Sequence, residues 1–156
     1  MKKIIYLIFA LFYSSISFAS IESKIIVNVG SEIISSYELK NKIKTTLILN
    51  NQELNQQSIN KTKSQSIQQL ITYKLKKNEI KKYNISSNKK SVTNFLNNTA
   101  SKYNTDLKGF QDLFSLNNIN YDLYLDEINT EFAWQKLIFD LYKNKINLNE
   151  KEIENE

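Results

Sequence analysis

The chain has 156 residues and a formal net charge of +5, with 21 Lys and no Arg, His, Cys or Pro. The missing His and Cys exclude a Ser-His-Asp triad, a cysteine nucleophile, an ordinary zinc site and a disulfide framework. Only two Gly are present, so no Gly-rich loop could cradle a phosphate. We therefore predict that these residues hold no metal, no cofactor and no catalytic group.

The charges argue against two further classes of protein. Lys2 and Lys3 lie in a segment that we expect to be removed, which leaves 19 Lys against 16 acidic residues and a net charge of +3. That excess is a weak basis for nucleic-acid binding, which typically uses a concentrated basic patch. Scattered carboxylates favour solvated helix faces over the paired acids of a hydrolase. They include Glu79, Asp112, Asp126, Glu127 and Glu131.

Residues 1–19 have the pattern of a secretory signal peptide. A basic start is followed by an apolar run from Ile4 to Phe12 and a polar tail, with Ser17 and Ala19 at the −3 and −1 positions of a cut after Ala19. The run of nine apolar residues is short of the ~20 that cross a bilayer, which favours cleavage over a membrane anchor. We therefore expect an exported, soluble domain of about 137 residues with no stable membrane insertion.

Residues 24–35 form the one convincing β segment of the sequence. Apolar residues alternate before the Gly30-Ser31 pair, which suits a two-residue turn, and Ile33 and Ile34 then form a short second strand. The alternating residues are Ile25, Val27 and Val29. Because a lone hairpin is marginally stable in water, we expect it to lie against the helices.

A capping box predicts where the first helix begins. The Ser35 hydroxyl is placed to accept from the backbone N–H of Glu38, while the Glu38 side chain reaches back. The helix is expected from Ser36 to about Leu49. Its apolar row is Leu39, Ile43 and Leu47.

Residues 50–60 are polar and predict a loop, after which a central helix is expected from near Ser64 to Tyr83. Asn84 is placed to end this helix in the left-handed conformation, and Ile85 to make the hydrophobic contact that follows such a cap. The apolar row of the helix is Ile67, Leu70, Ile71 and Leu75. We expect this row to hold the hairpin and the last helix together, so that Leu75→Asp would unfold the domain.

Two shorter helices are expected next. Ser86 is placed to cap the first of them, and the second starts around Thr105 or Asp106 and ends at Asn117 and Asn118. Their apolar faces carry Val92, Phe95 and Leu96 in the first helix and Leu107, Phe110, Leu113 and Phe114 in the second.

The last helix, expected from about Tyr121 to Tyr142, carries apolar residues on two faces. One stripe is Tyr121, Leu125, Ile128, Phe132 and Phe139, and the other is Trp134, Leu137, Ile138 and Leu141. Two interpretations follow: a helix buried between layers, or a face left open for a bound chain or a missing part of the protein. Residues 149–156 have the pattern of the first turn of a further helix.

Several local patterns, in this order and spacing, closely resemble the N-terminal domain of SurA-type periplasmic chaperones. Residues 33–39 resemble the family's strand and helix start, and residues 85–87 and 148–153 resemble its helix entry and its exit from the domain. The central helix matches the family pattern at Leu70, Ile71, Lys74, Leu75, Glu79 and Ile85, with Ile80 in place of a small residue and Asn84 in place of Gly. The resemblance covers Ile25 to Ile153.

The resemblance implies a mainly α fold, a multi-helix domain with a short N-terminal β-hairpin at residues 20–149, followed at 150–156 by the start of a truncated helix or linker. It further implies an ATP-independent chaperone module of the periplasm that holds unfolded outer-membrane protein chains. Aromatic side chains on the last helix are the candidates for contacting these clients, although each could instead belong to the core. They are Tyr121, Tyr124, Trp134 and Phe139.

Members of the family usually continue into parvulin-type prolyl isomerase domains, whose sites commonly use His. This chain has no His, so we predict no isomerase activity for these residues. Two alternative functions stay open: the non-catalytic part of a longer isomerase, and a structural adaptor that binds a folded partner. An apolar face left open would also permit a homodimer.

Overall fold

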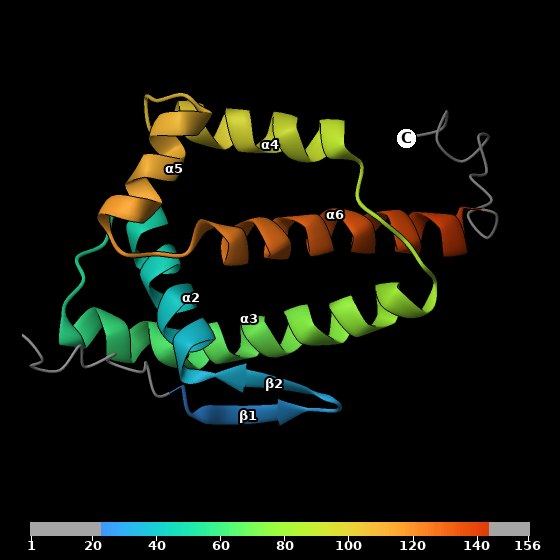
Figure 1. Cartoon of the computed structure of the whole chain (residues 1–156), viewed down its shortest axis with the longest axis horizontal. Coiled ribbons are helices and arrows are strands. Elements are labelled where there is room, and N and C mark those ends of the chain that lie inside the picture. The colour runs from blue at the N-terminus through green and yellow to red at the C-terminus, as the bar shows by residue number, and fades with distance from the viewer. Residues whose placement is uncertain (1–22, 144–156) are drawn as a thin grey trace, which may run out of the picture.

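A computed structural model describes residues 23–143, in which a two-stranded hairpin precedes five helices (Figure 1). The elements are β1 (Ile25–Val29), β2 (Glu32–Ser35), α2 (Ser36–Leu49), α3 (Gln56–Lys82), α4 (Lys89–Lys102), α5 (Leu107–Leu116) and α6 (Tyr121–Tyr142). The predicted mainly α fold with a short N-terminal hairpin is confirmed. The expected signal peptide at residues 1–19 and the expected helix start at 150–156 lie outside the described residues.

The hairpin and the start of α2 form as their local sequence predicts. β1 and β2 pair antiparallel, with Val29 opposite Glu32 across a turn in which Gly30 has a φ of 61°. The Glu38 N–H donates to the Ser35 hydroxyl over 3.1 Å, and the Ser35 N–H donates to the Glu38 carboxylate over 2.9 Å, which completes the capping box. One face of the hairpin packs on the helices. The buried cluster at this contact joins the hairpin to α2 and α3 and consists of Val29, Ile34, Leu39, Ile43, Leu47 and Leu70.

The central helix α3 begins at Gln56, well before the expected start near Ser64. The Asn55 side chain accepts from the Ser58 N–H over 2.9 Å and so caps the helix. Its first two turns carry a single apolar residue, Ile59, which packs against the core, and one apolar residue gives no periodicity that could mark a helix. The predicted loop is therefore shorter than residues 50–60.

The expectation that Leu75 belongs to the core is wrong, because its side chain is 56% exposed. Leu75 is five positions after Leu70, which places the two side chains about 140° apart on a helix. The buried residue at this level of α3 is Lys74, whose ammonium lies 2.7 Å from the Glu38 carboxylate. The prediction that Leu75→Asp would unfold the domain is withdrawn accordingly.

Four helices end in the same way, on an Asn in the left-handed conformation. Asn51, Asn84, Asn104 and Asn118 have φ between 50° and 54°. After Asn84, the Ile85 N–H donates to the Ile80 carbonyl over 3.2 Å, as the left-handed cap predicts. The predicted start of the third helix is wrong, because α4 is capped by Asn88, which accepts from the Ser91 N–H, and not by Ser86.

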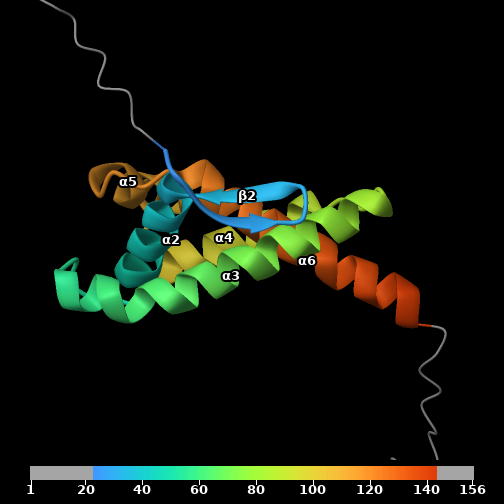
Figure 2. The same ribbon diagram turned by 90° about the horizontal axis from the view of Figure 1, so that it is seen from below.

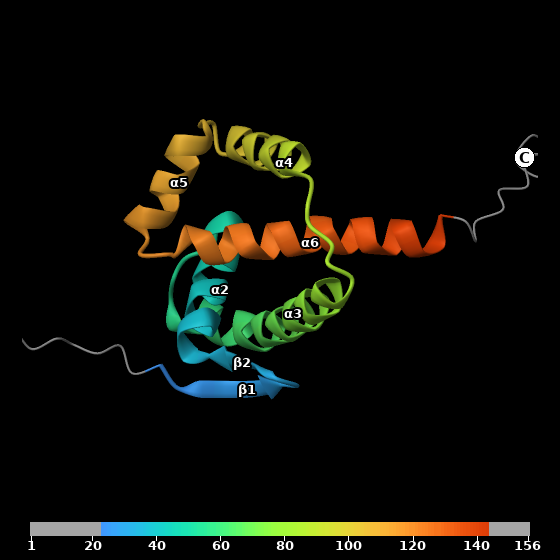
Figure 3. The same cartoon turned by 45° about the vertical axis from the view of Figure 1, so that its right-hand side comes forward.

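Helices α3 and α6 run in the same general direction and cross obliquely, with α2 across one end of the pair (Figures 1 and 2). Helices α4 and α5 lie on the other side of α6, where an aromatic cluster around Phe110 and Phe114 forms the second part of the core. A small third cluster of Ile80, Ala133 and Leu137 joins α3 to α6. Beyond it, the last turns of α6 extend past the neighbouring helices (Figure 3).

Candidate functional site

The four aromatic residues predicted to contact clients separate into two pairs along α6. Tyr121 and Tyr124 lie at its start, and Trp134 and Phe139 in its second half. At a rise of ~1.5 Å per residue, roughly 27 Å of helix separates Tyr121 from Phe139. The fold therefore does not bring the four side chains into a single site.

Tyr121 and Tyr124 pack in the aromatic cluster between α5 and α6. Their ring centroids lie 5.2 Å and 5.1 Å from that of Phe114, a distance typical of stacked or edge-on rings. Tyr124 is only 8% exposed, and burial raises the pKa of its phenol to about 12. Burial also raises the pKa of Tyr121, which is less deeply covered. These two rings stabilise the fold where α5 meets α6.

Trp134 and Phe139 instead line an apolar groove of about 470 Å³ on the last turns of α6. The Phe139 side chain is 64% exposed, and Ile138 and Leu141 beside it are 36% and 43% exposed. Trp134 is half-buried against the third core cluster, with the Lys76 ammonium 5.9 Å from its ring centroid. The groove is lined by Glu131, Trp134, Gln135, Ile138, Phe139, Tyr142 and Lys143.

Of the two interpretations of the two-faced helix, the described residues therefore favour an open face at this end of α6. Leu137 is the last buried residue of the helix, and each residue from Ile138 to Lys143 is exposed. Apolar side chains exposed together mark an interaction surface more often than isolated ones do.

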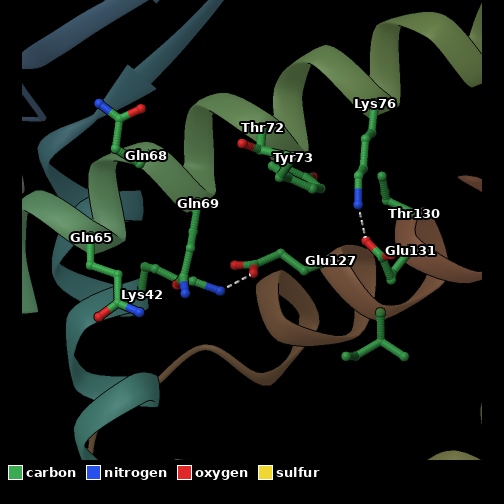
Figure 4. A pocket seen from close by; sticks show the side chains of 11 residues that line it. Lys42, Gln65, Gln68, Gln69, Thr72, Tyr73, Lys76, Glu127, Thr130 and Glu131 are labelled. Atoms are coloured by element: carbon green, nitrogen blue, oxygen red, sulfur yellow. Dashed lines mark hydrogen bonds and ion pairs between the residues drawn. The ribbon is translucent and has the colours of Figure 1, made fainter.

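A second hollow of about 460 Å³ between α2, α3 and α6 was not predicted (Figure 4). We call it the polar cleft because most of its lining residues are polar, although their exposed surface in the cleft is mainly apolar. Lys42 pairs with Glu127 across it, and Lys76 pairs with Glu131. Gln65 and Gln69 on α3 point toward the Lys42–Glu127 pair (Figure 4). A sequence signal for the cleft exists, because Gln65, Gln69, Thr72 and Lys76 follow the spacing of one helix face, but polar stripes are ordinarily read as solvated surface.

A third ion-paired group fixes α6 against α3. Asp126 accepts from the Tyr73 hydroxyl and from Lys77, whose ammonium also lies 3.0 Å from the Tyr73 oxygen. Burial alone would raise the pKa of Asp126, but the hydrogen bonds from Lys77 and Tyr73 outweigh it and hold this pKa below its usual value. Burial, together with the bond to Asp126, raises the pKa of Tyr73 well above its usual value. The first half of α6 is thus firmly held, which gives the exposed end a rigid support.

Residues 23–143 include no cluster of His, Cys, Asp or Glu arranged to hold a metal ion. Within the same range, no helix has the length and apolar character needed to cross a membrane. Residues of α6 line both the polar cleft and the apolar groove.

The family comparison identifies which domain this is. The model of the SurA-like N-terminal domain matches residues 1–138, so the chain belongs to this family. No parvulin domain was detected in the 156 residues. A search of curated proteins found no match to the sequence. Membership of the family suggests a chaperone-type module that binds client proteins.

Proposed function

We propose that this chain is an ATP-independent chaperone module of the periplasm, which holds unfolded outer-membrane protein chains. The observation that carries the proposal is the exposed apolar end of α6, with Phe139 64% exposed on a helix whose first half is ion-paired to α2 and α3. A rigid apolar surface binds exposed apolar segments of a client reversibly and keeps them from one another. The family membership supports the same function.

Within this proposal, Trp134 and Phe139 contact the client, whereas Tyr121 and Tyr124 support the helix from the core side. Aromatic rings bury a large area at a small loss of side-chain entropy, so they are suited to binding many sequences. Phe139 contributes most because its ring is the more exposed of the two. Export by the sequence at residues 1–19 would bring the module to the compartment through which outer-membrane proteins pass.

Aggregation of a denatured β-barrel protein, followed by light scattering, tests this function. We expect stoichiometric amounts of the purified protein to suppress scattering, and Phe139→Ser to lose at least half of that suppression. The matched control is Leu116→Ser on α5, which removes a side chain that is 82% exposed and lies outside the groove. No suppression by the unaltered protein, or equal losses in both variants, would contradict the proposal.

We further propose that these residues have no prolyl isomerase activity, because the sequence has no His of the kind that parvulin sites commonly use. The measurement is isomerisation of a proline peptide with the purified protein, and we expect the uncatalysed rate. Turnover above that rate would overturn this part of the proposal. The chaperone assay is unaffected by either result, since holding a client requires no catalysis.

A further inference from the structure

The hairpin has an open edge and an exposed apolar face. β1 pairs with β2 on one side, and within residues 23–143 no other strand joins this two-stranded sheet. Ile25 and Ile26 on β1 and Ile33 on β2 are 60%, 41% and 44% exposed, although the opposite face of the hairpin is buried. In Figures 1 and 3, β1 is the outer strand of the hairpin and lies farther from α6 than β2 does.

The backbone groups of β1 that point to the open edge follow from its pairing with β2. Antiparallel pairs alternate between hydrogen-bonded and non-hydrogen-bonded residues, and Val29 and Glu32, which flank the two-residue turn, form a hydrogen-bonded pair. Asn28 is the next residue along the strand, so its N–H and carbonyl point away from β2. Ile26 has no partner on β2, because the register shifts at this point. These two residues therefore carry backbone donors and acceptors that another strand can bind.

Open edges of this kind are ordinarily protected. Soluble proteins place charged side chains or Pro on an edge strand, since an uncovered edge recruits other strands. β1 has neither a charged residue nor a Pro between its bounds, Ile25 and Val29. Its one irregularity, at Ile26, increases the local twist but does not remove the free backbone groups. The edge is therefore suited to pairing with a further strand.

A second copy of the chain fits this edge. Two identical antiparallel strands are related by a twofold axis, which is the commonest symmetry of protein dimers. With the axis at Val27, Ile26 of one copy lies opposite Asn28 of the other, so the open backbone groups of both copies meet. In the same register Ile25 lies opposite Val29, and the whole strand is paired. Because the strand carries no charge, no like charges face one another across the axis.

The length of β1 sets how tightly two copies associate. Five residues at ~3.4 Å each span about 17 Å, so the contact belongs to the smallest class of interface, with less than about 1,200 Å² of total buried surface. Interfaces of this size are typical of weak, transient complexes. We therefore expect association to depend on protein concentration.

We propose that β1 is a self-association surface, at which two copies of the chain form a continuous four-stranded antiparallel sheet. The inference does not rest on the proposed chaperone function, because no residue of the hairpin lines the groove on α6.

Introduced cysteines test the register, since the chain has no Cys of its own. The backbone groups of Val27 point to β2, so the two copies of Val27 form a non-hydrogen-bonded pair with Cα atoms ~4.5 Å apart, where a disulfide can form. The control on the same strand is Ile25→Cys, because its two copies lie roughly 14 Å apart at ~3.4 Å per residue. Under mild oxidation we expect Val27→Cys to form a covalent dimer about tenfold faster than Ile25→Cys.

Two exposed Ile residues of the hairpin distinguish the edge from the apolar face. Ile26→Lys places a charge on the open edge, which opposes pairing. Ile33→Lys is the matched control on β2, with nearly the same exposure, 44% against 41%. Sedimentation velocity at increasing protein concentration measures association. We expect the average mass of the unaltered protein and of Ile33→Lys to rise toward that of two chains, and the mass of Ile26→Lys to stay at that of one.

A single-chain mass at every concentration, or equal cross-linking of the two Cys variants, would overturn the proposal. Equal loss of association in the two Lys variants would also overturn it, because the contact would then lie on the apolar face. If the protein stays a single chain but Ile26→Lys lowers its suppression of aggregation, the edge binds a client strand and not a second copy.

Discussion

Apolar side chains occur in both parts of α6, but the two parts have opposite environments. From Tyr121 to Leu137 the helix is held by the aromatic cluster, by the contact of Ala133 with Ile80, and by ion pairs to α2 and α3. From Ile138 to Lys143 it contacts solvent, although Leu141 and Phe139 are as apolar as the residues buried before them. The difference shows that an apolar stripe becomes core only where another element packs on it.

The sharpest comparison is between two Leu residues of α6 that are one turn apart. Leu137 is 2% exposed and Leu141 is 43% exposed. Leu137→Ala should lower the free energy of unfolding by about 2 to 5 kcal/mol, because it opens a cavity, whereas Leu141→Ala should change it by less than about 0.5 kcal/mol. Urea denaturation of both variants measures the difference. Similar losses would show that the end of α6 is covered like its middle.

Carboxylates on the same helix allow a second comparison. The side chains of Lys42 and Glu127 are 16% and 19% exposed, whereas those of Lys143 and Asp140 are 45% and 39% exposed. Glu127→Gln should cost about 1 to 3 kcal/mol, since it leaves a partly buried ammonium without its counter-ion. Asp140→Asn should cost at most about 0.5 kcal/mol, because exposed pairs contribute little. A loss in Asp140→Asn as large as that in Glu127→Gln would contradict this assignment.

Acid should weaken the ion-paired contacts that α3 makes with α6 and with α2. The pKa of Asp126 is lowered from its ordinary 3.8, because hydrogen bonds from Lys77 and Tyr73 outweigh the effect of burial. The pKa of Glu38 is lowered from 4.5 in the same way, by hydrogen bonds from Lys74 and Ser35. With lowered pKa values in the fold, the unfolded chain binds protons first as the pH falls. The stability that these groups contribute is therefore present above their ordinary pKa values of 3.8 and 4.5, and it is lost as the pH falls through their lowered values in the fold.

Asp126→Asn removes one of these titrating groups and should flatten the dependence of the urea midpoint on pH in the acid range. Asp140→Asn is the control, because the exposed pair of Asp140 with Lys143 contributes little to stability. If both variants show the slope of the unaltered protein, Asp126 does not contribute to the acid sensitivity.

The smallest effect on stability is expected at Leu75 of α3, which the apolar periodicity of the helix predicted to be buried. Leu75 is 56% exposed, so Leu75→Asp should leave a folded protein whose stability changes by about 0.5 kcal/mol or less. Leu70, which is 3% exposed, is the matched position, and Leu70→Asp should unfold the domain because it buries a charge without a partner. Circular dichroism at increasing temperature distinguishes the two outcomes.

Much of the fold is local and could be predicted from the sequence. The capping box at Ser35, the turn at Gly30 and the left-handed Asn84 depend on hydrogen bonds and backbone preferences within a few residues. Such local signals set the order of the helices and strands and most of the residues at which these elements begin and end. Local patterns gave the wrong start for two helices, because more than one nearby residue could act as the N-cap. Asn55 caps α3 in place of a residue near Ser64, and Asn88 caps α4 in place of Ser86.

The candidate site was harder to predict, because it depends on which faces meet. Periodicity gives the angle between Leu70 and Leu75 around α3, but the packing of α2 and the hairpin decides that Lys74 is covered and Leu75 is not. In the same way, the four aromatic residues of α6 share a helix in the sequence. Only the packing of α4 and α5 buries Tyr124, whereas Phe139 lies beyond these helices and stays in solvent.

The sequence by itself thus determined the hairpin, the helices, some of their caps and the family to which the domain belongs, since each of these depends on short-range patterns. The tertiary structure alone decided that the end of α6 is exposed and that a polar cleft forms beside Lys42 and Gln69. The physical reason is that the burial of a side chain is a property of its neighbours in space, and Lys42, Gln69 and Glu131 become neighbours only when three helices pack.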